Sequence, residues 1–321
     1  MDTGSKDGHS DHHSHHFDGT HYVVSQDIDL LVERWCNNSH LAPPSDSFYL
    51  ELRSSLKDFL KNIFANVTIV ASEEIRSGLL ESAIKYEQAG LTVVSLERAY
   101  LEDGEVGGRI ELTRTVDEDG DDIIIPSPRF GTPDKRSQFE RLRGKNIALF
   151  DDVIFSGRTL IETISALHQY HVNVHAVTVA VGVKDGVDKL RNAGFCVSGM
   201  PKQLNIECLD EFDDVSDQVC ERDFYPGIPY SGRQYFCDDT AFPYLLPFGR
   251  PDKWASIPEK ELKKFSALCI DNTISLFEEI ERINGTIIPC SAVPRPVYGF
   301  PKNGTRFVDL LAEARVKMLR A

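Results

Sequence analysis

The stretch Lys145–Leu160, KNIALFDDVIFSGRTL, constrains the fold more than any other part of the chain. It begins with the apolar run Ile147–Phe150, which has the length and composition of a buried parallel strand. Two adjacent aspartates, Asp151 and Asp152, follow at the carboxyl end of this strand, and a short turn then leads into a helical pattern. The succession of strand, turn and helix predicts an α/β fold with its site beyond the strand ends.

The turn Phe155–Thr159 has the features of an anion-binding site. Free backbone N–H groups and the positive end of the helix dipole point into the same space at the start of a helix. Ser156 and Thr159 add hydroxyl donors, and Gly157 lets a phosphate approach the backbone because it has no Cβ. The neighbouring aspartates require hydrogen-bond donors or a cation. We therefore expect a phosphate on one side and sugar hydroxyls or a metal ion on the other.

At these residues the chain resembles a known family. The order of apolar strand, Asp-Asp, three residues and Ser-Gly-x-Thr resembles the motif with which type I phosphoribosyltransferases bind 5-phosphoribosyl 1-diphosphate (PRPP). The Gly-Arg-Thr version is most similar to the pyrimidine-operon attenuator proteins. The resemblance implies that Asp151 and Asp152 are the catalytic pair, hold the ribose hydroxyls and lie near Mg²⁺, directly or through water. It implies that the 5′-phosphate is bound by Phe155, Ser156, Gly157, Arg158 and Thr159. The alternative is an ordinary strand-turn-helix with a solvated acidic corner.

Two further segments are candidates for the pyrophosphate of PRPP. The strand-like run Asn66–Ala71 is followed by Arg76, Ser77 and Gly78, which resemble the family's pyrophosphate loop in position and type. For the side chain of Arg76, a solvated arginine at a helix start is the competing interpretation. Arg98 follows the next strand, where the family commonly places a basic residue that reaches the pyrophosphate.

The acceptor of the ribosyl group is not revealed by the sequence. Lys184 follows a strand at a place where hypoxanthine-guanine enzymes contact a purine carbonyl, and Phe224 and Tyr225 belong to an aromatic, Gly- and Pro-rich segment that is suited to cover a planar group. For each, a purely structural role is the alternative. Phe155 stands where the hypoxanthine-guanine enzymes have an aspartate, which counts against that purine chemistry.

The remaining pattern predicts how the chain is organised. After strands at 66–71 and 91–96, those at 147–150, 172–181 and 195–198 alternate with helices, so the right-handed crossover rule gives a doubly wound parallel sheet. The resemblance implies a flexible loop or β-hairpin at 101–141 that closes over PRPP. We expect a disordered His-rich tail at 1–20, a helical lead-in at 21–64, the phosphoribosyltransferase core at 65–215 and an α-rich C-terminal extension at 216–321.

Composition limits the classes of partner. Thirty-five Lys and Arg residues face 50 Asp and Glu residues, and the formal charge of −15 argues against broad nucleic-acid binding. No apolar run approaches the ~18 residues that cross a membrane, and the N-terminus lacks a signal-peptide core. Seven scattered cysteines without a CxxC pair suggest a reduced, cytoplasmic protein.

Three functions compete at this point. The first is a Mg²⁺-dependent phosphoribosyltransferase that transfers the ribosyl group of PRPP to a nitrogenous small-molecule acceptor and releases pyrophosphate. The second is an inactive regulatory protein that senses PRPP or a nucleotide and acts on a protein partner; a homodimer also stays open. PRPP synthetase, the third, is disfavoured because the chain has no duplicated domain and no Ala-Gly-Thr loop.

Overall fold

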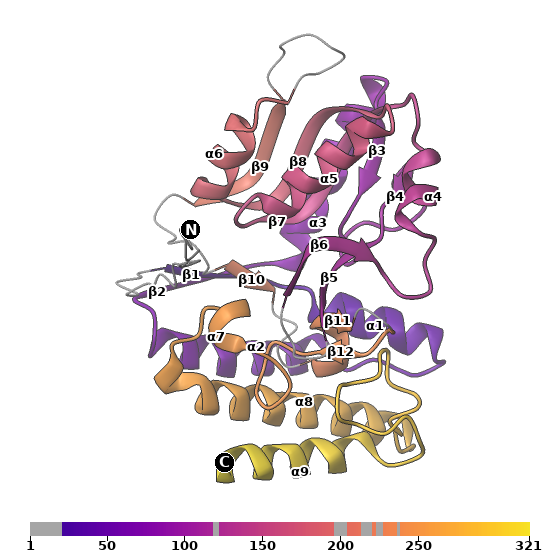
Figure 1. Ribbon diagram of the computed structural model, residues 1–321. Helices are drawn as coiled ribbons and strands as arrows, with labels where there is room; N and C mark the ends of the chain where they lie inside the picture. The colour runs from indigo at the N-terminus through magenta and orange to yellow at the C-terminus, as the bar shows by residue number, and fades with distance from the viewer. Residues whose placement is uncertain (1–20, 118–121, 196–203, 213–219, 223–226, 236–237) are drawn as a thin grey trace, which may run out of the picture.

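A parallel sheet forms the centre of the upper layer of the computed structural model (Figure 1), and it confirms the predicted α/β class. The structure describes residues 21–117, 122–195, 204–212, 220–222, 227–235 and 238–321. Every neighbouring pair of the sheet is parallel. The strands, in sheet order, are β4 (Gly108–Arg109), β3 (Thr92–Ser95), β7 (Asn146–Ile154), β8 (Asn173–Val183) and β9 (Asn205–Phe212).

Helices cover both faces of this sheet, as a doubly wound fold requires. Alternate residues of β7 point to opposite faces, so Ala148 and Phe150 pack in one hydrophobic core while Ile147 and Leu149 pack in the other. The first core also holds the apolar residues of α3 (Ser72–Gln88), and the second holds those of α5 (Arg158–Gln169) and α6 (Lys184–Asn192).

A second parallel sheet of three strands corrects the prediction for the N-terminal part. Its order is β10-β1-β2, with β1 (His21–Ser25) between β2 (Asn66–Val70) and β10 (Cys220–Arg222). The segment 66–70 was expected to be the first strand of the central sheet, but it pairs with β1 instead. The reason is that all five residues of β1 are buried, and such a strand needs backbone partners along both edges. The predicted helical lead-in therefore begins with a strand.

A third sheet joins the middle of the chain to its C-terminal part. The hairpin of β5 (Leu112–Val116) and β6 (Asp122–Pro128) is present at 101–141, where a loop or hairpin was expected. Strand β11 (Arg233–Tyr235) lies parallel to β5, and β12 (Ala241–Phe242) pairs with β11. Residues after 216 thus contribute strands to two sheets. The strand expected at 195–198 falls mostly outside the described residues, and β9 is the last strand of the central sheet.

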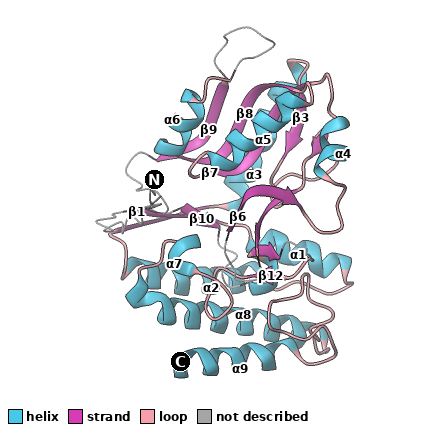
Figure 2. Ribbon diagram, viewed as in Figure 1, coloured by secondary structure: helices cyan, strands magenta, loops and turns pink. Residues whose placement is uncertain are grey.

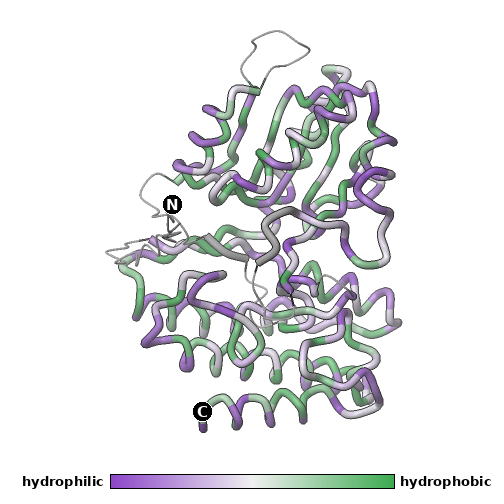
Figure 3. Tube along the Cα trace, in the orientation of Figure 1, coloured by the Kyte–Doolittle hydropathy of each residue, from purple (hydrophilic) through white to green (hydrophobic). Residues whose placement is uncertain are grey.

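Beneath the sheets lies a layer of helices (Figures 1 and 2), and it contains most of the C-terminal block. Helices α2 (Asp46–Lys61), α8 (Leu262–Asn284) and α9 (Phe307–Arg320) alternate hydrophobic and hydrophilic residues along their length (Figure 3), because one face of each packs inward. Among the described residues no helix is sufficiently long and apolar to cross a lipid bilayer. The remaining helices of the described residues are α1 (Ile28–Asn38), α4 (Lys135–Glu140), η1 (Ile228–Tyr230), α7 (Pro251–Trp254) and η2 (Glu259–Glu261).

Candidate functional site

A pocket opens at the carboxyl edge of the central sheet, between that sheet and the third sheet. It encloses about 340 Å³ and is lined by four separate segments of the chain. They are the end of β7 with the first turns of α5, the residues just after β3, the β5–β6 hairpin, and the segment 230–233 with Tyr244. The predicted residues Asp151, Asp152 and Phe155–Thr159 all line this pocket, so the structure brings the central motif to one place.

The turn after β7 is held in a shape that strongly favours glycine. Gly157 has φ +72°, and it caps α5, whose Ile161 N–H donates to the Gly157 carbonyl at 3.0 Å. A Cβ added to Gly157 would lie 2.6 Å from the carbonyl oxygen of Gly186. A Cβ added to Gly186, in α6, would lie 1.9 Å from the carbonyl oxygen of Phe155. Two glycines therefore let α6 press directly on the turn and fix the position of the helix start.

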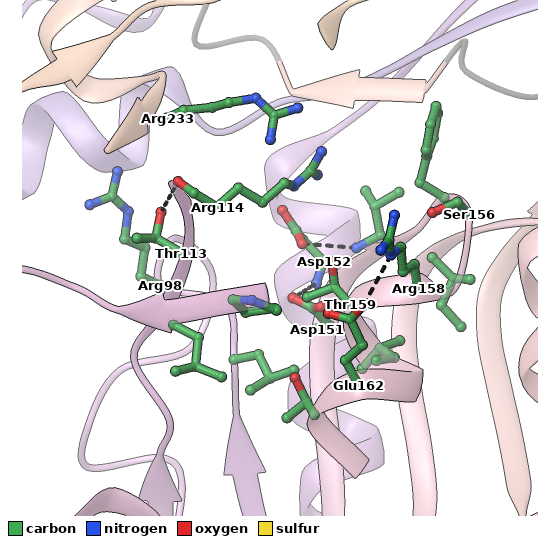
Figure 4. A pocket seen from close by; sticks show the side chains of 18 of the residues that line it. Arg98, Thr113, Arg114, Asp151, Asp152, Ser156, Arg158, Thr159, Glu162 and Arg233 are labelled. Carbon is green, nitrogen blue, oxygen red and sulfur yellow. Dashed lines mark hydrogen bonds and ion pairs between the residues drawn. The ribbon is translucent and has the colours of Figure 1, made fainter. Parts of the chain in front are cut away.

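The two aspartates lie side by side at the end of β7 (Figure 4). The backbone N–H of Asp152 donates to Asp151 Oδ1 at 3.0 Å, and Val153 N–H donates to Asp152 Oδ1 at 2.9 Å. Burial raises the pKa of the Asp151 carboxyl well above its usual range, and the negative charge of Asp152 raises it further. The ligand-free pair thus carries electrostatic repulsion, which hydroxyl donors or a cation would relieve.

Arginines line the pocket around the aspartates. Among the described residues that line the pocket five are arginines, although the whole chain is strongly acidic: Arg98, Arg114, Arg129, Arg158 and Arg233. In Figure 4, Arg98, Arg114 and Arg233 come from the side of the aspartate pair opposite Ser156 and Arg158. Such a concentration of guanidinium groups is suited to phosphate or carboxylate groups.

Arg158 and Arg98 differ in how firmly they are held. Arg158 Nε lies 3.0 Å from Glu162 Oε1, one turn further along α5, and the arginine side chain is 58% exposed. An exposed pair of this kind is weak, so the guanidinium is able to turn toward a ligand. Arg98 was predicted, and its Nη2 donates to the carbonyl oxygen of Tyr230 at 2.8 Å. That bond ties the segment after β3 to the C-terminal block.

Arg233 is a pocket residue that the sequence did not indicate. It is only 5% exposed, and its guanidinium carbon lies 4.7 Å from the centre of the Trp254 ring. It reaches the pocket because β11 pairs with β5, which places Gln234 beside Thr115. No local sequence pattern reports a pairing between residues so far apart. The weak signal that the chain offers is a single basic residue, Arg233, within an aromatic, Gly- and Pro-rich stretch.

Other predicted site residues lie elsewhere. The interpretation of Arg76, Ser77 and Gly78 as a loop at the strand ends is wrong, because α3 begins at Ser72 and these residues occupy its second turn. Arg76 Nη2 lies 2.6 Å from Glu105 Oε1, and none of the three residues lines the pocket. They follow β2, which belongs to another sheet, so the expected convergence with the motif does not occur.

The residues predicted for the acceptor are not assembled in the pocket. Lys184 is the first residue of α6; it is exposed and does not belong to the pocket lining. Phe224 and Tyr225 lie outside the described residues. For a metal, the part of the chain that the structure describes holds no group of three or more His, Cys, Asp or Glu side chains suited to bind an ion. The adjacent carboxylates of Asp151 and Asp152 are the predicted ligands.

Comparisons with known proteins give structural similarity alone. No family model and no curated protein matches the chain. An adenine phosphoribosyltransferase from Trypanosoma brucei, in complex with AMP, pyrophosphate and ribose-5-phosphate, is similar with 16% identity and a TM-score of 0.31, over 46% of this chain and 68% of that one. The enzyme from Giardia lamblia complexed with 9-deazaadenine is similar with 14% identity and a TM-score of 0.29, over 44% of this chain and 80% of that one. The enzyme from Leishmania tarentolae is similar with 16% identity and a TM-score of 0.30, over 46% of this chain and 74% of that one. We infer no activity from similarity at this level.

Proposed function

We propose that the protein is a phosphoribosyltransferase that binds PRPP with Mg²⁺ and transfers its 5-phosphoribosyl group to a nitrogenous acceptor with release of pyrophosphate. One observation carries the proposal: a single pocket combines an aspartate pair, a glycine turn at a helix start and a wall of arginines. PRPP has a matching set of groups, namely two ribose hydroxyls, a 5′-phosphate and a diphosphate. A pocket for a neutral sugar would not need the arginines.

Each part of PRPP has a partner in this scheme. Asp151 and Asp152 accept hydrogen bonds from the ribose hydroxyls, and this relieves the repulsion within the pair. The 5′-phosphate binds at the start of α5, where Ser156–Thr159 present backbone N–H groups and hydroxyls near the positive end of the helix. The diphosphate lies toward Arg98, and Arg114 and Arg233 neutralise the charge that grows as it leaves.

The aspartate pair also fits a magnesium ion. Mg²⁺ is commonly held by one or two carboxylates, with water and substrate phosphate oxygens as its other ligands. That preference agrees with a site that offers two adjacent carboxylates and a phosphorylated substrate. The bound ion would supply positive charge next to the leaving diphosphate. The protein's own contribution is to orient the ribose and to exclude water beneath the β5–β6 hairpin.

Calorimetry and a product assay test this function. PRPP is titrated into the protein with MgCl₂, and pyrophosphate release is then measured with a panel of nucleobases and amines. We expect Asp152→Asn to weaken PRPP binding at least about tenfold, because it removes a charged hydrogen-bond acceptor. Asp185→Asn, at an exposed position of α6, is the matched control and should bind PRPP as the wild type does. Unchanged affinity in Asp152→Asn would refute the assignment, and tight binding without release on any acceptor would favour the PRPP-sensing regulator.

A further inference from the structure

The segment Glu97–Leu101, which follows β3, is held by an unusual set of contacts. Five consecutive carbonyl oxygens, those of residues 97 to 101, each accept a hydrogen bond from an arginine. Arg34 donates to the carbonyls of Arg98 and Ala99, the latter at 3.2 Å. The other donors are Arg76, to Tyr100, and Arg109, to Glu97 and to Leu101, the last at 2.7 Å. We call Arg34, Arg76 and Arg109 the carbonyl clamp.

The opposite side of the same backbone is bound by one carboxylate. Glu97 is only 2% exposed, and its side chain accepts from the N–H groups of Ala99, Tyr100 and Leu101 at 2.5, 2.8 and 2.9 Å. A buried carboxylate needs such donors, and three successive N–H groups provide a concave anion site. With carbonyls fixed on one side and N–H groups on the other, the segment has little freedom to change shape.

The clamp residues come from three different elements and remain outside the pocket. Arg34 belongs to α1, Arg76 to α3 and Arg109 to β4. Arg76 and Arg109 are themselves held by carboxylates, at 2.6 Å from Glu105 and 2.9 Å from Asp103. None of the three lines the pocket, whereas Arg98, in the middle of the clamped segment, does. The clamp therefore acts on the pocket through Arg98.

We propose that Arg34, Arg76 and Arg109 are positioning residues that fix the backbone of Glu97–Leu101 so that Arg98 presents its guanidinium to the diphosphate of the substrate. This inference rests on the proposed function, which supplies the diphosphate. It replaces the sequence-based role of Arg76 as a direct ligand with an indirect one. Arginine suits the task because its planar fork bridges two carbonyls, as Arg34 and Arg109 do, and a lysine lacks that geometry.

A merely structural role accounts less well for this arrangement. The segment is buried at Glu97 and at Ala99–Leu101, so its carbonyls need donors from the protein, which in most buried segments are backbone N–H groups. Here three long arginine side chains are ordered instead, and each loses rotamer entropy. The segment that these three side chains order carries Arg98, which lines the pocket just after β3. Fixing Arg98 in advance lowers the cost of ordering it when the ligand binds.

Arg34 is the best residue to change, because it binds the carbonyl of Arg98 itself and contacts no pocket side chain among its hydrogen bonds. The variants are Arg34→Gln and Arg34→Lys, with Arg282→Gln, an exposed residue of α8, as the control. Two ligands are titrated: pyrophosphate with MgCl₂, and ribose 5-phosphate, which lacks the diphosphate. Hydrogen exchange of the amides at 96–102 is measured on the same proteins, and thermal melting verifies that each is folded. Arg109→Lys repeats the test if Arg34→Gln does not fold.

We expect Arg34→Gln to weaken pyrophosphate binding about tenfold and to leave ribose 5-phosphate within twofold of the wild type. Arg34→Lys should retain an intermediate affinity, and exchange at 96–102 should rise in both variants. Equal weakening of the two ligands, no weakening, or unchanged exchange would overturn the proposal. If the wild type binds neither pyrophosphate nor PRPP, the proposed function itself is refuted; faster exchange in Arg34→Gln would then assign the clamp to folding alone.

Discussion

The contact between α6 and the turn after β7 gives a sharp test of how the phosphate site is built. In Gly186→Ala the new Cβ would lie 1.9 Å from the Phe155 carbonyl oxygen, 2.7 Å from its carbon and 3.1 Å from the Gly157 nitrogen. All three are backbone atoms of the turn, so no flexible side chain is able to move aside. Ordinary contact begins at 3.4 Å, which means that the turn and α6 must separate by about 1.5 Å, the difference from 1.9 Å.

The substitution should change function more than stability. Alanine favours a helix over glycine by about 1 kcal/mol, whereas forcing extra volume into a packed contact costs about 1–3 kcal/mol, so the net loss of stability is at most about 2 kcal/mol. A shift of this size moves the N–H groups of the turn away from the 5′-phosphate, and misplacement by about 1 Å is able to cost 100-fold in rate. We expect ribose 5-phosphate to bind at least about tenfold more weakly.

Calorimetry with ribose 5-phosphate, together with thermal unfolding, measures both effects on Gly186→Ala. The control is Gly304→Ala, where an added Cβ meets nothing within 4 Å. It makes the same chemical change without a clash, and it should bind as the wild type does. If folded Gly186→Ala binds ribose 5-phosphate within twofold of the wild type, the turn is not the phosphate site that its geometry implies.

Two further substitutions test the electrostatics. Because burial and Asp152 raise the pKa of Asp151, the folded protein holds this proton more tightly than the unfolded chain does; the resulting stability is complete below the ordinary value of 3.8 and is lost as pH rises toward the raised pKa. Asp151→Asn should therefore stabilise the ligand-free protein by about 1–2 kcal/mol at pH 7.5 while abolishing PRPP binding. In urea unfolding, this gain in stability should shrink as the pH falls toward 4. A gain that does not depend on pH would contradict this account. Glu281 is 7% exposed and accepts hydrogen bonds from Arg306 Nη2 at 2.5 Å and from Ile288 N–H at 2.9 Å. Glu281→Ala should therefore lower the free energy of unfolding, measured in urea, by about 1–3 kcal/mol, whereas the exposed Glu313→Ala should lower it by less than about 0.5 kcal/mol. Equal losses in the two variants would show that burial of the ion pair is irrelevant.

The sequence predicted what lies close together along the chain. Strand β7, the aspartate pair and the start of α5 fall within sixteen residues, from Lys145 to Leu160, so their chemistry and their order were visible as one pattern. The α/β class followed from the alternation of strands and helices. Arg98 lines the pocket and was predicted for the same reason, because it comes shortly after a clear strand and the strand ends of a parallel sheet share one edge.

What the sequence did not predict depends on pairings across long separations. Strand β2 pairs with β1, a five-residue segment next to a His-rich stretch, and not with the central sheet. Arg76 lies in α3, the helix that follows β2, and is therefore not at the pocket edge. Arg233 entered the pocket through the pairing of β11 with β5. Hydrophobic periodicity reports which face of a strand is buried, but it does not report which strand is its neighbour.

The pairing of β5 with β11 also means that one edge of β5 lacks its partner strand for some time while the chain is synthesised. Gln234 lies opposite Thr115, so the ribosome adds 119 residues (234 minus 115) after Thr115 before Gln234 is complete. At about 5–20 residues per second this takes roughly 6–24 s, during which that edge of β5 has emerged from the ribosome without its neighbour. An uncovered strand edge is a template for pairing with other chains. Slow translation between residues 115 and 234 should therefore favour aggregation of the nascent protein, and chaperones that shield strand edges should counter it.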